Sequence, residues 1–574
     1  MTITRTIKRR SIAPGDDWSG QVGTEDVGPL LRRIYSARGA TTQALAMPRL
    51  TDLLPPDSLG GIDAATALLA DAIASDSHIV VVGDFDCDGA TACAVGVRGL
   101  RMLGAKRVSY AVPNRMVHGY GLSPALVEEL VGLAPDLLVT VDHGIACHAG
   151  IAAAKARGWR VLVTDHHLPG ERLPPADAIV DPNIPGDAFP SKMLAGVGVM
   201  FYVLLALRRR LRDAGSPASE DCDLSSLLDL VAVGTVADLV PLDANNRALV
   251  SAGLRRLRAG RGCAGLQALI EAARRQAATL SAMDIGFGIG PRINAAGRLE
   301  DMALGIECLL SDDPMQAREL AAVLDGINSE RRAVQQLMTD DAGIALAAVS
   351  ALDATPRSAH CLFHADWHPG VVGLVASKVK ERLHRPVVAF APGEPGSDVL
   401  RGSARSIPGF HIRDALAAVD AAHPGMIDRF GGHAMAAGLS LRHVQLAGFE
   451  AAFTAYADTM LDAELLRDEL LSDGDLQTNE FDHATALALR DGGPWGQGFP
   501  EPMFDGEFDV LAWRVVGERH LKLELGLQAL RLNAIHFGGW DGTPPAARVR
   551  IAYRLEPDDY RGGEAIQLVV MHRE

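Results

Sequence analysis

The chain has 574 residues, with 55 Lys+Arg against 71 Asp+Glu, and its formal net charge is −16. This length predicts about three or four domains. A content of 48% hydrophobic and 22% charged residues is typical of a folded globular protein and excludes an extended disordered chain. Taken alone, the negative charge argues against a nucleic-acid partner, because phosphate binding needs positive charge.

The cysteines and the apolar stretches narrow the class further. Seven cysteines are scattered without a CxxC pair, which favours a reducing compartment and excludes a structural zinc ribbon. The basic N-terminal segment lacks the apolar core of a secretory signal. The longest apolar stretch, residues 194–207, is shorter than the roughly 20 residues that a membrane span needs. We therefore expect a cytoplasmic protein that does not associate with a membrane.

The first part of the chain alternates between short apolar runs and helical segments. This pattern predicts βαβ units around a parallel sheet buried on both faces. The predicted strands are residues 78–82, 108–112, 137–141 and 161–164, and the predicted helices are 90–103, 124–131 and 146–156.

The rest of the chain divides into three further regions. Residues from about 190 to 350 are predicted to be mostly helical and to end in one long helix, 314–348. A second, smaller α/β region follows, with a strand at 361–363, a helix at 371–383, a strand at 387–390, and then Gly/Ser-rich loops. From about residue 465, short alternating runs, among them 504–510 and 514–516, predict an all-β module, which we interpret as a small barrel. The predicted domains are 1–50 (an N-terminal extension), 51–312, 313–350 (a connecting helix), 351–462 and 463–574.

Acidic residues follow three of the four strands of the first predicted sheet. Asp84, Asp86 and Asp88 follow the first strand, Asp142 follows the third, and Asp165, His166 and His167 follow the fourth. Asp238 lies in an apolar segment that otherwise has no reason to hold a charge. Since ligands of open α/β sheets bind at the carboxyl ends of the strands, we expect these side chains to form one site.

The chemistry of this set points to divalent metal ions. A single Asp after a strand is often a helix cap, and a single His is more often a hydrogen-bonded core or surface residue than a ligand. Several carboxylates at one edge repel one another unless cations neutralise them. Oxygen ligands with one or two imidazoles favour Mn²⁺ or Mg²⁺, and two such ions can activate water for displacement at phosphorus.

Four motifs at these positions resemble the signature motifs of the DHH phosphoesterases. They are DFDCDG (84–89), VDHG (141–144), TDHH (164–167) and GTVADLVP (234–241). Further blocks, including GPRINAAGRL (290–299), GSARSIPGF (402–410) and FGGHAMAAG (430–438), are similar to the bacterial single-strand-specific 5′→3′ DNA exonucleases of that superfamily. The resemblance implies a parallel-sheet DHH domain, a long connecting helix, a smaller α/β DHH-associated domain and a C-terminal OB-like barrel.

The resemblance also implies roles for the acidic set. Two divalent ions, Mn²⁺ or Mg²⁺, are expected at Asp86, Asp88, Asp142, His166 and Asp238. Asp84 and His167 are expected to complete the site in catalytic roles, with His167 contacting the scissile phosphate or serving as an acid. Cys87 and His143 depart from the usual residues of the family, each at a position next to an expected ligand.

Other motifs imply how a DNA end is recognised. In the second α/β region, Ser403, Arg405, Gly432 and His433 are expected to form a pocket for a 5′-phosphate, with Arg115 contributing from the first domain. Tyr120 is expected to stack on an unpaired base, with ordinary packing inside the fold as the alternative. Arg292, Asn294 and Arg298 are expected to contact the strand backbone. A narrow cleft between the two α/β domains is expected to admit one strand and exclude a duplex.

The expected activity is hydrolysis of single-stranded DNA to mononucleotides in recombination and repair. The resemblance implies a helicase and a single-strand-binding protein as partners, and we expect a monomer. Residues 465–574 hold 11 Lys+Arg against 19 Asp+Glu, so the sequence leaves open whether the barrel binds DNA or protein. Within the superfamily, a small-substrate phosphoesterase is an alternative, and a non-catalytic DNA-binding scaffold is a second. A nucleotide-cofactor dehydrogenase is disfavoured, because the first strand-to-helix turn is acidic and has no GxGxxG motif.

Overall fold

The fold is described from a computed structural model of residues 5–12, 18, 27–114, 117–352, 357–394, 396–558 and 560–574. The chain forms two compact units, and each combines segments that are distant in sequence. One unit contains residues 10–328 and 473–574; the other contains residues 1–9 and 329–472. Within the described residues, no helix is both long enough and apolar enough to cross a membrane.

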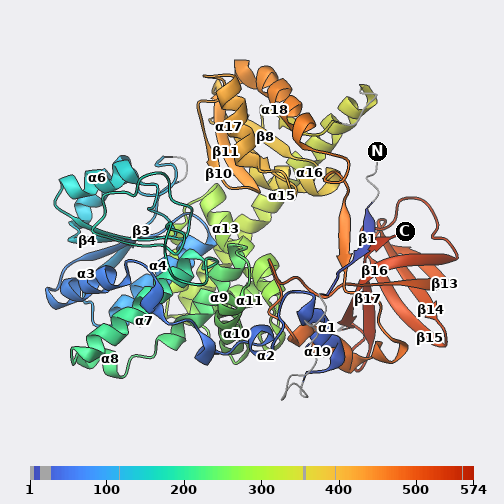
Figure 1. The fold of residues 1–574 in the computed structure, drawn as a ribbon, viewed down its shortest axis with the longest axis horizontal. Helices are drawn as coiled ribbons and strands as arrows, with labels where there is room; N and C mark the ends of the chain where they lie inside the picture. The colour runs from blue at the N-terminus through green and yellow to red at the C-terminus, as the bar shows by residue number, and fades with distance from the viewer. Residues whose placement is uncertain are drawn as a thin grey trace. The chain divides into compact units, whose positions relative to one another are not determined.

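The larger unit is built on a parallel five-stranded sheet in the order β3-β2-β4-β5-β6 (Figure 1). Its strands are β2 Ile79–Val82, β3 Val108–Ala111, β4 Leu137–Val141, β5 Arg160–Thr164 and β6 Ala178–Val180. Alternate strand residues face opposite layers. Val81 and Val139 belong to the apolar core with helices α3 Ile62–Ala74, α4 Cys87–Met102 and α7 Gly196–Asp213. Val80 and Leu138 pack with α5 Pro124–Glu129 and α6 His148–Ala156. The sheet is therefore buried on both faces, as predicted.

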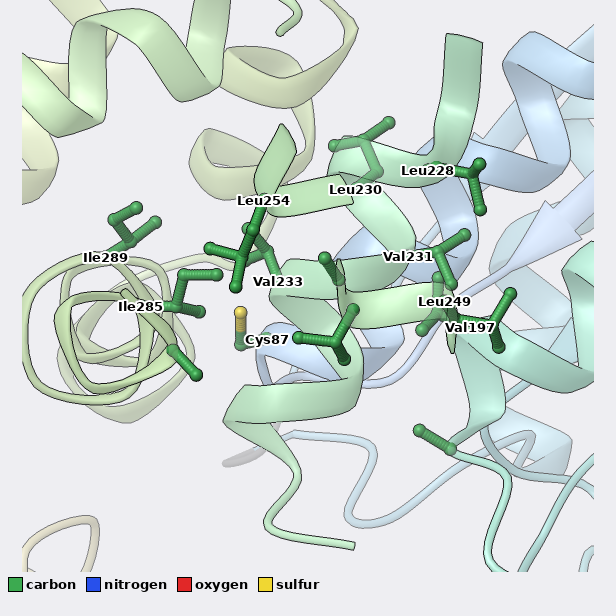
Figure 2. Packing of buried hydrophobic residues seen from close by; sticks show 14 of the residues in the cluster. Cys87, Val197, Leu228, Leu230, Val231, Val233, Leu249, Leu254, Ile285 and Ile289 are labelled. Atoms are coloured by element: carbon green, nitrogen blue, oxygen red, sulfur yellow. The ribbon is translucent and has the colours of Figure 1, made fainter. Parts of the chain in front are cut away.

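A layer of helices follows the sheet in the same unit. These helices are α8 Pro217–Glu220, α9 Leu228–Ala237, α10 Ala244–Arg258, α11 Ala264–Ala272, α12 Ala282–Asp284, α13 Gly290–Leu299 and α14 Ala303–Leu310, with a π-helical turn at Ile285–Ile289. Figure 2 shows the side chain of Cys87, at the start of α4, within the apolar cluster formed with Val233, Leu254 and Ile285. Core packing around this cysteine thus fixes one side of the segment that carries Asp84, Asp86 and Asp88, which we call the first acidic loop.

The N-terminal segment and the barrel complete this unit. Helices α1 Pro29–Ser36, α2 Gln43–Ala46 and α19 His483–Asp491 accompany a closed barrel of strands β13 Phe504–Val516, β14 His520–Leu527, β15 Leu530–His536, β16 Arg548–Pro557 and β17 Ile566–Arg573. The barrel order is β13-β14-β15-β17-β16, with β15 and β17 parallel. The two runs predicted at 504–510 and 514–516 form the single strand β13, which contains an irregularity between Val510 and Ala512.

The smaller unit has a mixed sheet in the order β10-β11-β9-β8-β7. Its strands are β7 His360–Phe363, β8 Val387–Pro392, β9 Val399–Arg405, β10 Arg429–Gly432 and β11 Ala436–Arg442, and its helices are α16 Val372–Leu383, α17 Ile412–Ala422 and α18 Leu446–Met460. The expectation of Gly/Ser-rich loops after β8 is wrong, because β9, β10 and β11 form an antiparallel ladder there. Glycines lower strand propensity, and the ladder forms because alternate residues such as Leu400 and Leu439 enter the core.

Two other elements differ from the sequence predictions at the unit boundaries. The long helix α15 runs over Pro314–Leu352, close to the predicted 314–348, and the boundary between the units falls within it, after Asn328. Part of the predicted N-terminal extension forms strand β1 Thr6–Arg9, which pairs in parallel with β12 Glu469–Ser472 in the smaller unit. Such pairing between segments far apart in the chain leaves no local sequence signal.

Candidate metal centre

The first acidic loop is shaped by helix capping at the start of α4. Asp86 is the N-cap residue, and its carboxylate accepts hydrogen bonds from the backbone N–H groups of Asp88 (2.9 Å) and Gly89 (3.1 Å). The helix therefore begins at Cys87, earlier than predicted. This places Asp88 in the first helical turn and leaves Asp84 in the connection from β2.

Asp88 is held by a second helix. Its two carboxylate oxygens accept hydrogen bonds from the backbone N–H groups of Gly196 (2.6 Å) and Val197 (3.0 Å), at the start of α7. A Cβ atom at Gly196 would lie 2.5 Å from the Cβ of Asp142, so only glycine allows α7 to approach both aspartates this closely. The unpaired N–H groups of a helix N-terminus favour a negative charge, which explains why Asp88 is tolerated in the interior.

The acidic and histidine side chains predicted from separate strand ends meet at one edge of the sheet. Their potential ligand atoms form three groups within which all atoms lie within 4.8 Å of one another. The groups are Asp84, Asp86, Asp142; Asp88, His166, Asp238; and Asp142, His166, His167. Asp142 and His166 each belong to two groups, so the groups form one continuous cluster. All of the predicted catalytic and metal-binding residues are included.

Direct distances connect the groups. His166 Nε2 lies 3.1 Å from Asp142 Oδ1 and 3.6 Å from Asp238 Oδ2. Asp142 follows β4 with a φ angle of 63°, a left-handed conformation that costs energy in a residue other than glycine. Asp238 is the C-cap residue of α9. Strand ends and helix ends therefore contribute to the same small volume.

The electrostatics of the cluster are unfavourable without cations. Burial, followed by the charges of Asp238 and Asp86, raises the pKa of Asp88 well above its usual value. Burial, followed by the charge of Asp88, does the same to the pKa of Asp142. Burial and the charge of Asp86 raise the pKa of Asp238 to about 7. Hard oxygen donors that repel one another in this way fit Mn²⁺ or Mg²⁺, whose charge offsets the repulsion.

His167 has an orienting partner in Asp165. Its Nδ1 lies 2.7 Å from Asp165 Oδ1, while the other oxygen of Asp165 accepts a hydrogen bond from the Ile145 N–H (2.9 Å). Burial favours the neutral imidazole, but the hydrogen bond and charge of Asp165 outweigh it and raise the pKa of His167 to about 9. Asp165 therefore orients His167 instead of adding a carboxylate to the ligand groups.

The residues of this unit that were predicted to contact the DNA strand lie in different settings. Tyr120 lies at the cluster, with its hydroxyl 3.4 Å from His167 Nε2 and its side chain about half exposed. Asn294 accepts a hydrogen bond from the Cys87 N–H (2.8 Å), which ties α13 to the acidic loop. Arg298 is half-buried in the last turn of α13. Arg115 lies outside the described residues.

Arg292 is buried and engaged within the fold. It donates a hydrogen bond to the carbonyl oxygen of Gly288 (2.6 Å) and forms an ion pair with Asp325 (2.8 Å). These contacts tie α13 to the preceding turn and to α15. Contact of this side chain with a DNA strand stays a prediction.

In the smaller unit, the predicted phosphate-pocket residues lie at one end of the mixed sheet. Arg405 pairs in register with Ala436, and the turn between β10 and β11 carries His433 next to Gly432. Gly432 has a φ angle of 139°, and a Cβ there would lie 2.5 Å from the carbonyl oxygen of Ala436, so this tight turn requires glycine. Ser403 accepts a hydrogen bond from Arg405 (3.0 Å).

Arg405 has only neutral hydrogen-bond partners among the described residues. Its guanidinium donates to the hydroxyls of Ser377 and Ser403 and to the carbonyl oxygen of Ala404. Burial lowers its pKa. A half-buried cation without a carboxylate partner is costly, and an anion at this position would offset that cost.

A fourth acidic strand end was not among the predicted residues. Asp181 follows β6, is fully buried, and accepts a hydrogen bond from the Asn183 N–H (2.8 Å). Asn183 in turn donates from Nδ2 to the carbonyl oxygen of His166 (2.6 Å). These contacts fix the main chain of the histidine pair. The signal that could have found Asp181 is the short run 178–180, which is apolar and is followed by an acidic residue like the other strands.

Comparison with known proteins agrees with this architecture. Residues 78–235 match the model of the DHH family N-terminal domain, residues 347–459 match the DHHA1 domain, and residues 472–572 match the RecJ OB domain. The parallel sheet with its acidic edge, followed by these two domains, defines a protein of the DHH class.

Full-length relatives specify the family. A Dickeya dadantii protein named single-stranded-DNA-specific exonuclease RecJ is 49% identical over 558 residues, 95% of each chain. Crystal structures of RecJ from Thermus thermophilus in complex with Mn²⁺ and with Mg²⁺ match with TM-scores of 0.81 and 0.77 at 32% and 29% identity. Both matches cover 99% of this chain, and 79% and 78% of the matched chains. The chain belongs to the RecJ family.

Replacing one of the mutually repelling carboxylates is expected to raise the stability of the metal-free protein and to weaken metal binding. Asp142→Asn should raise the melting temperature of the metal-free protein by about 2–4 °C, because it removes charge repulsion inside the cluster. The same variant should lose most of the stabilisation that Mn²⁺ gives to the wild type. Differential scanning fluorimetry with and without Mn²⁺ measures both effects.

A matched control is available at Asp229. This carboxylate is also buried, accepts a hydrogen bond from the Cys263 N–H (2.7 Å) and, among the described residues, belongs to none of the ligand groups. Asp229→Asn should leave the Mn²⁺-induced shift unchanged. A full Mn²⁺ shift in Asp142→Asn would contradict a role of Asp142 in the metal site.

The contact between Asn183 and His166 is expected to affect metal affinity without contributing a ligand. Asn183→Ala should weaken Mn²⁺ binding about 10-fold, because outer partners orient metal ligands. Electron paramagnetic resonance of free Mn²⁺ measures this directly. Asn245→Ala removes a buried amide that binds Tyr202 instead, and serves as the control. Equal Mn²⁺ affinity in wild type and Asn183→Ala would exclude this role.

Proposed function

We propose that this protein is a metal-dependent exonuclease that degrades single-stranded DNA from the 5′ end to mononucleotides. The observation that carries the proposal is the collection of strand-end and helix-end carboxylates with two adjacent histidines in one cluster. Such a set is suited to hydrolysis at phosphorus. The name of the relatives, single-stranded-DNA-specific exonuclease, supports DNA as the substrate.

The residues present fit two divalent cations, Mn²⁺ or Mg²⁺. Asp86, Asp88, Asp142, His166 and Asp238 would hold the ions, and Asp84 completes the group on the β2 side. When bound, such ions lower the pKa of water and offset negative charge at the scissile phosphate. The Mn²⁺ and Mg²⁺ complexes of the Thermus relative support this choice of metals.

The protein's own side chains position the phosphate and restrict its approach. His167, oriented by Asp165 through Nδ1, contacts the scissile phosphate from the side of the cluster where Tyr120 lies. The ring of Tyr120, also within contact of Phe85, stacks on an unpaired base. A base within a duplex is already stacked on both faces and cannot use this ring.

Recognition of the 5′ end is assigned to the smaller unit. Arg405, with Ser403, Gly432 and His433, binds a terminal phosphate. The supporting observation is that, within the described part of the chain, every hydrogen-bond partner of the half-buried Arg405 guanidinium is neutral. A phosphate at this position supplies the missing negative charge through charge-assisted hydrogen bonds.

The cellular setting follows from the same specificity. An enzyme restricted to single strands depends on another protein to open a duplex, so we propose that it acts with a helicase and a single-strand-binding protein. We place this activity in recombination and repair in the cytoplasm. One chain supplies every residue of the proposed metal site, which supports a monomer.

A digestion time course tests the proposed activity. With Mn²⁺ or Mg²⁺, a 5′-labelled single strand should release labelled mononucleotide at the start of the reaction, whereas a 3′-labelled strand should shorten progressively. Duplex of the same sequence should remain intact, and EDTA should stop all cleavage because the cluster then holds no cations. Internal cuts, or release of mononucleotide first from the 3′ end, would contradict the proposal.

Loss of the Arg405 guanidinium is expected to affect 5′-phosphorylated ends selectively. Arg405→Ala should raise KM for a 5′-phosphorylated strand by about 10- to 100-fold, because it removes a charge-assisted hydrogen bond. For a 5′-hydroxyl strand KM should change much less. Arg401→Ala, on the same strand β9, is the matched control. Equal losses on both kinds of end would exclude a phosphate pocket at Arg405.

A further inference from the structure

The larger unit contains a cavity of about 1010 Å³ formed without any residue of the metal cluster. Its walls come from the segment around α2, the last turns of α10, the segments that follow α11, the connection before β13, and the end of β16. Seven arginines and five acidic residues line it. We call it the arginine groove. Its local excess of positive charge contrasts with the net charge of −16 of the chain.

Most of the arginines of the groove are engaged within the protein. Arg275 forms an ion pair with Asp284 (3.2 Å), and Arg490 forms one with Asp491 (3.0 Å). Arg554 pairs with Glu501. Arg258 donates to the carbonyl oxygen of Leu280 (2.7 Å). These ion pairs compensate three of the five acidic residues of the wall, and seven arginines against five acids leave an excess of two positive charges.

Two arginines of the groove differ from the others. Arg255, in the last turn of α10, and Arg274 are both exposed. Neither guanidinium has an ion pair or a side-chain hydrogen bond within the part of the chain that the structure describes. Both therefore present uncompensated positive charge to the groove.

The backbone at Arg274 gives an independent indication. Arg274 follows the end of α11 with a φ angle of 53°, in the left-handed position where glycine is the usual residue. The N–H groups of Arg274 and Arg275 bond to the carbonyl oxygens of Glu271 and Ile270, which closes the helix end. Glycine would make the same turn without strain, so the arginine side chain is not explained by the fold.

We propose that the arginine groove binds the phosphate backbone of single-stranded nucleic acid, with Arg255 and Arg274 each contacting a phosphate. A polyanion matches two uncompensated guanidinium groups in an open, polar groove. The end of barrel strand β16 borders the groove, and barrels of this class bind single strands. The inference rests on the proposed function and gives the enzyme a contact to the part of the strand not yet degraded.

The test compares the double variant Arg255→Gln/Arg274→Gly with wild type. Glycine at position 274 keeps the left-handed turn, so its melting temperature should not fall below that of wild type. The control is Arg256→Gln/Arg318→Gln, which removes two positive charges outside the groove. Binding of fluorescent single-stranded DNA of about 8 and about 40 nucleotides is measured by anisotropy in EDTA, over a range of salt concentrations.

The groove variant should bind the longer strand about 5- to 20-fold more weakly, and the slope of log K against log salt should fall by about 1.4, or roughly 0.7 for each lost phosphate contact. Binding of the shorter strand, and its cleavage with Mn²⁺, should change less than about twofold. The control should retain the wild-type slope. An unchanged slope for the longer strand in the groove variant, or an equal loss in the control, would overturn the proposal.

Two further readouts separate the possible failures. Poly-glutamate, an acidic polypeptide, tests the alternative that the groove docks an acidic protein. If the groove variant loses binding of poly-glutamate but retains binding of the longer strand, the groove is a protein-docking site and the proposal is wrong. If wild type fails to cleave the shorter strand, the proposed function fails. The salt dependence of binding to the longer strand still decides whether the groove binds nucleic acid.

Discussion

The mutual repulsion of buried carboxylates at one edge of the parallel sheet is the constraint on which the rest of the structure depends. Asp88 and Asp142 are both inside the protein, and burial together with neighbouring charge raises the pKa of each. The fold tolerates this because the N-terminus of α7 binds Asp88 and because core packing around Cys87 fixes the loop that carries the acids. Divalent cations offset the remaining repulsion, so the site is stable in its metal-bound form, which is the form suited to hydrolysis.

The same constraint changes the meaning of the net charge. A charge of −16 argues against DNA only if it is spread evenly. In this chain part of the acid is concentrated where cations offset it, and 19 of the acidic residues lie in residues 465–574. Among the described residues, arginines without carboxylate partners lie elsewhere: Arg405 in the smaller unit, and Arg255 and Arg274 in the arginine groove. Local pairing, and not total charge, determines where a phosphate can bind.

Predictions from the sequence agree with the structure where a local pattern has one structural outcome. Acidic residues directly after apolar strands reach the same edge of a parallel sheet, so Asp84, Asp142 and His166 were expected together and lie together. Agreement is poorer where the outcome depends on distant partners. Strand β9 was missed because its glycines suggested loops. The ion pair between Arg292 and Asp325 also left no sign in the sequence, because Asp325 lies on another helix. Asp181 was missed because β6 is only three residues long.

The sequence by itself determined the class of fold, the acidic site and the kind of metal it suits, because strand periodicity and the residues that follow each strand are local properties. Only the tertiary structure decided which side chains are compensated. Asp165 proved to orient His167, Asn183 proved to hold the main chain of His166, and Arg274 proved to have no ion pair within the described residues. The physical reason is that a charge is paired or unpaired according to groups brought near it by folding, and no local pattern records those groups.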